Sequence, residues 1–195
     1  MHEPDGYLST DERDDVIASL EHLRRCLITS QTKSEEWKWA ILAAHAALCG
    51  ALVCVTAGTA QVGCLSDKSR ARMIAWLHSD FSAPRPPERL AEPAELLRRA
   101  CSRTHSDRRG PPLRISVNVL RDLARLHEFR NQLMHFRPLG WSIELAGLPR
   151  MIGRAVDVAA RLMRSIDVAH QLPDEQLRRL DAVLEQVHSL LSGDG

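Results

Sequence analysis

Aromatic side chains are scarce in this 195-residue sequence. They make up 4% of the chain, so a hydrophobic core has to be built mainly from leucine, alanine, valine and isoleucine, as in helical bundles. The length suffices for one domain with a substantial core. The formal net charge of +1 excludes a protein that binds nucleic acid through bulk positive charge, so any contact with RNA has to be local.

The motifs of common nucleotide hydrolases and proteases are also missing. The sequence contains no glycine-rich phosphate loop with a Walker lysine, no G-x-S-x-G and no H-E-x-x-H. The segment Met1–Asp5 is acidic and has no apolar run, so we expect no secretory signal. The five cysteines form no C-x-x-C pair, which favours reduced thiols and a cytoplasmic protein. We expect no cofactor.

Apolar residues recur at helical spacing along most of the chain and predict an all-α fold. We expect a helical bundle of about five long helices with two short inserted helices. The long helices are predicted at about 10–29, 34–56, 116–137, 149–170 and 173–192, and the short ones at 70–78 and 93–101. A single domain would cover 9–192, with a helical and loop insertion at about 66–113 and tails at 1–8 and 193–195.

The segment from Ala40 to Ala60 contains no charged residue. Its length and hydropathy would also fit a transmembrane span, which makes a membrane-attached helical protein one alternative. His45 lies in its first half, many alanines replace larger apolar residues, and the flanking amphipathic helices need a soluble core. We therefore favour a helix that is buried on all sides, and expect no contact with a membrane.

A polar triad interrupts the apolar stripe of the 116–137 helix. Arg130 falls inside the stripe, where a guanidinium is costly unless an acidic side chain or an anionic ligand such as phosphate meets it. Glu35 or Glu36 could supply the carboxylate. Asn131 and His135 lie four residues apart on one face, and the exposed carbonyls of the last turn favour a protonated His135. These are the groups needed to hold a phosphodiester and move a proton.

The sequence Arg130-Asn131-x-x-x-His135, late in an all-helical chain, resembles the R-x4-6-H signature of HEPN domains. The segments 36–41 and 136–145 also resemble the surroundings of this motif in a group of bacterial HEPN-like proteins, and the similarity runs from about Asp11 to the last helix. The resemblance implies a metal-independent endoribonuclease whose site is shared across a homodimer. It also implies a toxin or defence-related role, with a possible neutralising antitoxin or defence-system partner.

In the reaction that the resemblance implies, a ribose 2′-hydroxyl of the RNA attacks the adjacent phosphate. His135 would act as general base or acid, Arg130 would stabilise the developing charge, and Asn131 would orient one of them. In the toxin subgroup that has a nucleotidyltransferase partner, a modifiable tyrosine follows the histidine by two residues. Arg137 stands at that position here, so silencing by such a modification is not expected.

Helix geometry gives a separate reason to expect a dimer. Arg130 and His135 are five residues apart, about 140° around an ideal helix, so one chain presents them awkwardly, and two motif helices across a twofold axis would solve this. The alternative from another class is an inactive HEPN-like module that binds RNA, a nucleotide or a protein. The plainest alternative makes Arg130 a core ion-pair partner and His135 a helix-terminal residue bonded to a carbonyl.

Further basic residues lie close to the motif in the sequence. His127 is one turn before Asn131. The candidate substrate contacts are His127, Arg137, Arg108, Arg109 and Arg114. Arg98-Arg99, Arg103 and His105 would belong to the same basic cluster, which fits a solvated loop equally well. The pairs His22/Cys26 and His45/Cys49 have the spacing of zinc ligands, but cysteine is a common core residue, and we expect no metal.

Overall fold

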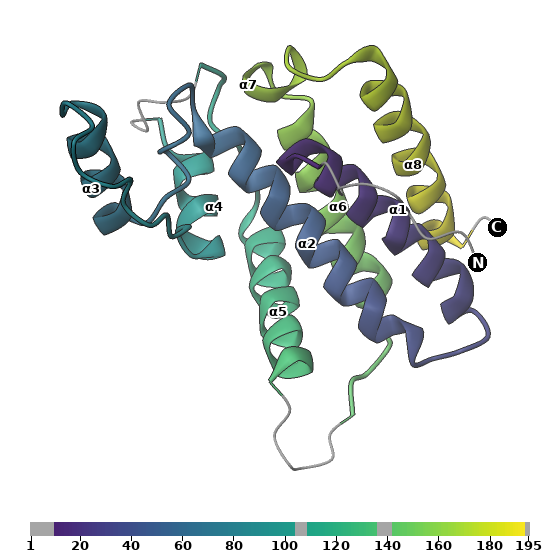
Figure 1. Cartoon of the computed structure of the whole chain (residues 1–195). Helices are drawn as coiled ribbons and strands as arrows, with labels where there is room; N and C mark the ends of the chain where they lie inside the picture. Colours follow the sequence, from purple (N-terminus) through teal and green to yellow (C-terminus); the bar gives the residue numbers. More distant parts are fainter. Residues whose placement is uncertain (1–9, 104–108, 136–141, 194–195) are drawn as a thin grey trace, which may run out of the picture.

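The computed structural model describes residues 10–103, 109–135 and 142–193, and within them it contains eight α-helices and no β-strand (Figure 1). The predicted all-α fold class is therefore confirmed. The helices are α1 (Glu12–Ser30), α2 (Glu36–Ala57), α3 (Asp67–Leu77), α4 (Pro93–Cys101), α5 (Val117–Met134), α6 (Leu148–Met163), α7 (Ile166–Ala169) and α8 (Asp174–Ser192).

Helix α2 is the centre of the molecule. It packs against α1, α4, α5, α6 and α7, which explains why its sequence is apolar on every side. Across the described ranges it is the one helix long and apolar enough to cross a membrane, and 61% of the apolar window is buried inside the protein. The core helix of a bundle has this same combination of length, composition and burial.

Helices α1 and α2 pack closely against each other at Gly50. A Cβ atom added to Gly50 would lie 2.7 Å from Cγ2 of Val16, so this position requires glycine for the two backbones to come together. Helix α1 begins after Asp11, whose side chain accepts hydrogen bonds from the backbone N–H groups of Arg13 and Asp14. Asp11 is therefore the N-cap of α1.

Helix α5 is fixed to the bundle on the side of α6. It begins close to the predicted start, and its N-cap Ser116 accepts a hydrogen bond from the Val119 N–H at 3.4 Å. Asp122 is buried, and its carboxylate accepts a hydrogen bond from Arg154 of α6 at 2.5 Å. The helix ends at Met134, three residues before the predicted end, and His135 leaves the helical conformation with φ −117° and ψ 75°.

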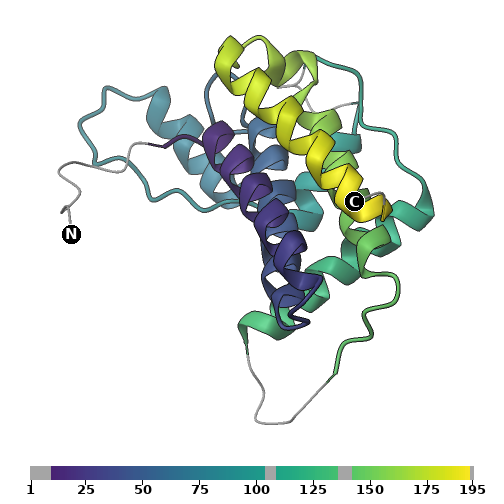
Figure 2. The ribbon, with the colours of Figure 1, turned by 90° about the vertical axis from the view of Figure 1, so that its right-hand side faces the viewer.

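The segment between α2 and α5 contains two helices with different surroundings. Helix α4 packs against α2 and buries Leu96 and Ala100. Helix α3 lies at the edge of the molecule in both views and buries only Ser69 and Met73 (Figures 1 and 2). Two antiparallel backbone hydrogen bonds hold the base of this segment, Ser66 N–H to Arg89 O at 2.8 Å and Ala91 N–H to Cys64 O at 2.9 Å.

Candidate functional site

An open cleft of about 470 Å³ lies between α2, α5 and the start of α4. Two of the three motif residues, Arg130 and Asn131, line it from α5. The lining residues are Leu42, His45, Ala46 and Cys49 of α2, Glu92 and Pro93 at the start of α4, and His127, Arg130, Asn131 and Met134 of α5. The positions on each helix are three or four residues apart, so each helix turns one face to the cleft.

Four polar side chains in this cleft form a continuous chain of hydrogen bonds. Arg130 Nη1 donates to Asn131 Oδ1 at 2.9 Å, and Asn131 Nδ2 lies 3.0 Å from His127 Nε2. His127 Nδ1 in turn lies 2.9 Å from His45 Nε2, across from α5 to α2. The chain therefore runs from the motif arginine into the buried face of the central helix.

The inner end of this chain is uncharged. His45 is only 7% exposed, and burial, followed by the nearby charges of His127 and Arg130, lowers its pKa from 6.5 to about 4. Cys49 lies 3.6 Å from His45 Nδ1. Burial raises the pKa of the Cys49 thiol to about 11, although Arg130 acts in the opposite direction. Both groups are neutral at physiological pH, so Arg130 supplies the positive charge.

Arg130 has no acidic partner within the part of the chain that the structure describes. No carboxylate there lies within 4.0 Å of its guanidinium nitrogens. The expectation that Glu35 or Glu36 would pair with it is wrong, and Glu92, which also lines the cleft, forms no ion pair with it. Its side chain is half-buried at the cleft instead of being enclosed in the core.

His135 is separated from the other two motif residues. It is exposed at the C-cap of α5, where its backbone N–H donates to Asn131 O at 2.9 Å. Its imidazole makes no hydrogen bond to a described residue, and it is not among the residues that line the cleft. A single chain therefore brings Arg130, Asn131 and His127 together and leaves His135 apart.

The other candidate substrate contacts lie elsewhere or outside the described residues. Arg114 is exposed before the first turn of α5, and since a helix rises about 1.5 Å per residue it lies roughly 20 Å from Arg130 along the axis. Arg109 lines a different cavity of about 450 Å³ that shares no residue with the cleft, and its backbone N–H donates to Asp167 at 2.6 Å. Arg108 and Arg137 lie outside the described residues.

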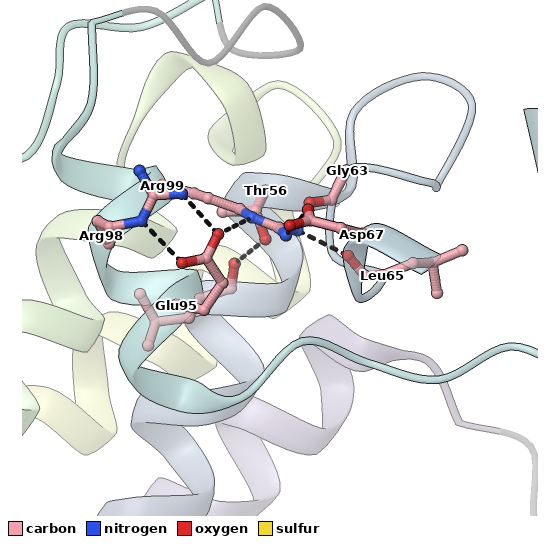
Figure 3. A network of polar contacts seen from close by, with 8 residues as sticks. Thr56, Gly63, Leu65, Asp67, Glu95, Arg98 and Arg99 are labelled. Atoms are coloured by element: carbon pink, nitrogen blue, oxygen red, sulfur yellow. Dashed lines mark hydrogen bonds and ion pairs between the residues drawn. The ribbon is translucent and has the colours of Figure 1, made fainter. Parts of the chain in front are cut away.

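The fully buried arginine of the described chain is Arg99, in α4 (Figure 3). Its guanidinium donates to the Glu95 and Asp67 carboxylates and to the carbonyls of Gly63 and Leu65, at 2.7–2.8 Å. Hydrogen bonds from Arg98, and then from Arg99, lower the pKa of Glu95 to about 2. Including Arg99 in a substrate-binding basic patch is therefore wrong, because protein groups occupy its donors.

A second, mainly apolar cavity of about 740 Å³ opens beside the cleft and shares His45, Pro93 and His127 with it. Leucine and alanine side chains of α2, α4 and α5 make up much of its wall. They are Leu48, Leu52, Ala94, Leu97, Leu120, Leu123 and Ala124. The two histidines therefore lie between the cleft that Arg130 lines and an apolar cavity.

Among the described residues, no group of three or more histidine, cysteine, aspartate or glutamate side chains is arranged to hold a metal ion. The zinc alternative needs both His/Cys pairs at one site, whereas His22 lies against Cys26, and His45 lies against Cys49 and His127.

The residue that sequence reasoning missed is His45, which was noted for its spacing to Cys49 and not as a partner of His127. A histidine in a long uncharged run that is buried needs a hydrogen-bond partner, and this was the available signal.

A scan against protein-family models, a search of curated proteins and a search of solved structures each found no match to this chain. Its function therefore has to be inferred from its own residues and from the resemblance of its motif.

Proposed function

We propose that this protein is a HEPN-like endoribonuclease that cleaves RNA without a metal ion, at a site shared across a homodimer. A toxin or defence-related role in the cytoplasm, with a possible neutralising partner, forms part of the proposal. The observation that carries it is Arg130, an arginine that lines an open cleft with no carboxylate partner among the described residues. A guanidinium in this position is suited to bind a phosphate, with the bidentate geometry that arginine favours.

The reaction needs a base, an acid and a positive charge. A base removes the proton from a ribose 2′-hydroxyl, the new bond between the 2′-oxygen and phosphorus forms, and the bond from phosphorus to the 5′-oxygen breaks. An acid returns a proton to that 5′-oxygen, which leaves a 2′,3′-cyclic phosphate and a 5′-hydroxyl. His135 is the proposed proton-transfer group and Arg130 stabilises the charge on the phosphate oxygens. The nucleophile belongs to the RNA, so no metal-bound water is required.

The separation of His135 from the cleft supports a shared site. His135 is exposed at the end of α5, where it is open to a second copy of the chain. Two apolar side chains are also exposed at this end, Met134 (52%), which lines the cleft, and Trp39 (45%), one turn before Leu42. A second copy that covers them would place its own His135 beside Arg130 of the first.

The test is cleavage of total RNA by the purified protein, with and without a chelator. We expect cleavage in both conditions, with cyclic phosphate ends, and its loss in Arg130→Ala and His135→Ala. Arg121→Ala, an exposed arginine of the same helix, and His78→Ala, an exposed histidine at the C-cap of α3, are the matched controls and should retain activity. Full activity in both motif variants would overturn the proposal.

A mixing experiment tests whether the site is shared. Random association of Arg130→Ala and His135→Ala subunits gives about one half mixed dimers, each with one complete and one doubly defective site. Activity should therefore recover to about one quarter of the wild-type value, although each variant alone is inactive. If the mixture stays inactive while mass measurement shows that mixed dimers form, Arg130 and His135 do not act across the interface.

The second candidate is a HEPN-like module that binds RNA or a nucleotide without cleaving it. The apolar cavity of about 740 Å³ beside the cleft favours it, because the cavity has the size and lining of a ligand pocket. This candidate predicts saturable binding of RNA that depends on Arg130 and does not depend on His135, with no cleavage product in any condition.

A further inference from the structure

The hydrogen-bond chain in the cleft has a direction that Arg130 imposes. An arginine guanidinium can only donate, so Asn131 must present its carbonyl oxygen Oδ1 to Nη1, as observed at 2.9 Å. The amide nitrogen Nδ2 of Asn131 then faces His127 Nε2 at 3.0 Å. Because Nδ2 carries hydrogens and has no acceptor function, His127 Nε2 has to be the unprotonated nitrogen of a neutral ring.

The same reasoning fixes the next two groups. A neutral His127 without a proton on Nε2 carries it on Nδ1, and this N–H donates to His45 Nε2 at 2.9 Å. His45 then carries its own proton on Nδ1, 3.6 Å from the sulfur of Cys49, whose thiol is a weak acceptor. The chain therefore runs in one direction, from Arg130 through Asn131 and His127 to His45.

The reversed arrangement creates a conflict at one end. If the Asn131 amide were turned over, Nδ2 and the Arg130 Nη1 would be two donors facing each other. If His127 carried a proton on Nε2, that hydrogen would face the hydrogens of Asn131 Nδ2. Each change breaks the bond between Arg130 and Asn131 or the bond between Asn131 and His127. The ordering of Arg130 at one end and of His45 at the other therefore depends on the tautomer of His127.

The surroundings keep His45 neutral. His45 is buried in α2 and faces His127 and Arg130 of α5, which both disfavour a second positive charge. Glu92 and Arg98 from the α4 side and Glu128 of α5 line the two cavities, but none forms a hydrogen bond or ion pair with a member of the chain. No acidic group of the described residues therefore offsets a proton on either ring.

From this geometry we infer that His45 and His127 are positioning residues for Arg130. They hold the Asn131 amide in the one orientation that accepts from Arg130 Nη1, while no described residue accepts a hydrogen bond from Arg130 Nε or Nη2. The guanidinium is thereby fixed through one nitrogen and keeps the others for an anion in the cleft. That the anion is an RNA phosphate rests on the proposed function. The hydrogen-bond chain itself rests on geometry alone.

The first experiment measures the tautomers by nitrogen-15 NMR of histidine side chains at neutral pH. We expect His127 and His45 each to carry the proton on Nδ1, which is the less common form of free histidine. Two substitutions of His45 separate the roles. His45→Gln keeps an acceptor near the position of Nε2, whereas His45→Leu removes it. We expect His127 to keep its tautomer in His45→Gln and to populate the Nε2–H form in His45→Leu.

The second readout is Arg130 itself. In His45→Leu, rotation of the Arg130 guanidinium should become faster by nitrogen-15 relaxation, and a 2′-O-methyl RNA oligonucleotide, which cannot be cleaved, should bind about three- to tenfold more weakly, as expected for one ordering hydrogen bond. His45→Gln should match the wild type in both. A purely structural role for His45 would change the stability of both variants but would not follow this acceptor rule.

A third variant remains informative if His45→Leu does not fold. Asn131→Asp keeps an acceptor for Arg130 and offers a second carboxylate oxygen to His127, so His127 should take a proton on Nε2. A wild-type His127 protonated on Nε2, unchanged Arg130 ordering in His45→Leu when the tautomer shifts, or a His127 that stays unprotonated on Nε2 in Asn131→Asp, overturns the inference. Failure of the wild type to bind the oligonucleotide overturns the proposed function instead, since the tautomers and the Arg130 ordering are measured without RNA.

Discussion

Two arginines of this chain, Arg99 and Arg130, have opposite surroundings. Arg99 is 2% exposed and donates four hydrogen bonds, to two carboxylates and two backbone carbonyls. Arg130 lines an open cleft and donates one hydrogen bond, to the neutral amide of Asn131. The donors of Arg99 are occupied by the protein, whereas most donors of Arg130 face no acceptor among the described residues.

The difference indicates what each arginine is for. Fixing the loop from Gly63 to Asp67 against α4 is a structural task, and a buried guanidinium does it because its fork reaches carbonyls and carboxylates at once. An arginine with donors left over costs stability if it is buried, so it is placed at an opening where an anion can complete its bonds. Arg99 therefore serves folding, and Arg130 is the candidate for ligand binding.

The largest expected effect is the loss of RNA cleavage in Arg130→Ala. Arg130→Ala should lower RNA cleavage by about 10²- to 10³-fold, the range found when one donor to a developing oxyanion is removed. Its free energy of unfolding should stay within about 0.5 kcal/mol of the wild type, because no ion pair is lost. Initial cleavage rates and urea unfolding of the same preparation check this. A large loss of stability would make Arg130 a structural residue like Arg99.

The reverse pattern is expected for Arg99→Met. The apolar replacement leaves the carbonyls of Gly63 and Leu65 without their donor, so the free energy of unfolding should fall by about 2 to 4 kcal/mol in urea. Arg98→Met is the matched control, because Arg98 contacts the same Glu95 carboxylate but is exposed, and it should lose much less stability than Arg99→Met. Equal losses in the two variants would contradict a special role for the buried arginine.

The sequence predicted the helices better than it predicted the two arginines. Apolar periodicity placed this helix at about 116–137, close to the observed α5, because that signal lies within the helix itself. The end of α5 was set three residues too late, because the proline at 138 limits a helix without fixing its last residue. The choice of Arg130 as an arginine enclosed in the core came from a stripe drawn on one helix, and the actual face of α5 at that point opens to a cleft.

The parts that sequence reasoning did not reach depend on contacts between distant segments. Besides Glu95 one turn earlier, Arg99 is held by residues more than 30 positions earlier, in a loop whose carbonyl directions no local pattern reveals. His45 and His127 are 82 residues apart, and their contact follows from the packing of α5 on α2. Spacing rules find partners on one helix, so they found the His45/Cys49 pair and missed the histidine across the interface.

The cleft at His45 and the Arg99 network at Glu95 should lose stability in different ranges of acid pH. The folded state holds the His45 pKa at about 4, below its usual 6.5, so the unfolded chain binds a proton first and stability falls between pH 6.5 and about 4, by up to about 3 kcal/mol. The Glu95 pKa of about 2 lies below its usual 4.5, so the stability from that carboxylate is lost only between pH 4.5 and 2. Urea unfolding at a series of pH values measures both.

Substitutions of His45 and Glu95 show which group causes each of the two losses of stability. His45→Leu should flatten the change between pH 6.5 and 4 and leave the lower one, whereas Glu95→Gln should do the opposite. An unchanged slope above pH 4.5 in His45→Leu would show that His45 is not the group that titrates there.

The smallest expected effect is the loss of stability in Asp67→Asn, which removes one carboxylate that contacts Arg99. Asp67 contacts Arg99 at 2.8 Å, but its side chain is 91% exposed, whereas that of Glu95 is 31% exposed. Water can replace much of what an exposed carboxylate contributes, so Asp67→Asn should lower the free energy of unfolding by less than about 1 kcal/mol, part of it through the lost charge in the first turn of α3. Glu95→Gln, measured in parallel by urea unfolding at neutral pH, should cost more. If Asp67→Asn lowers the free energy of unfolding as much as Glu95→Gln does, the exposed carboxylate contributes as much as the shielded one. Burial of its partners would then not explain why Arg99, unlike Arg130, is a structural arginine.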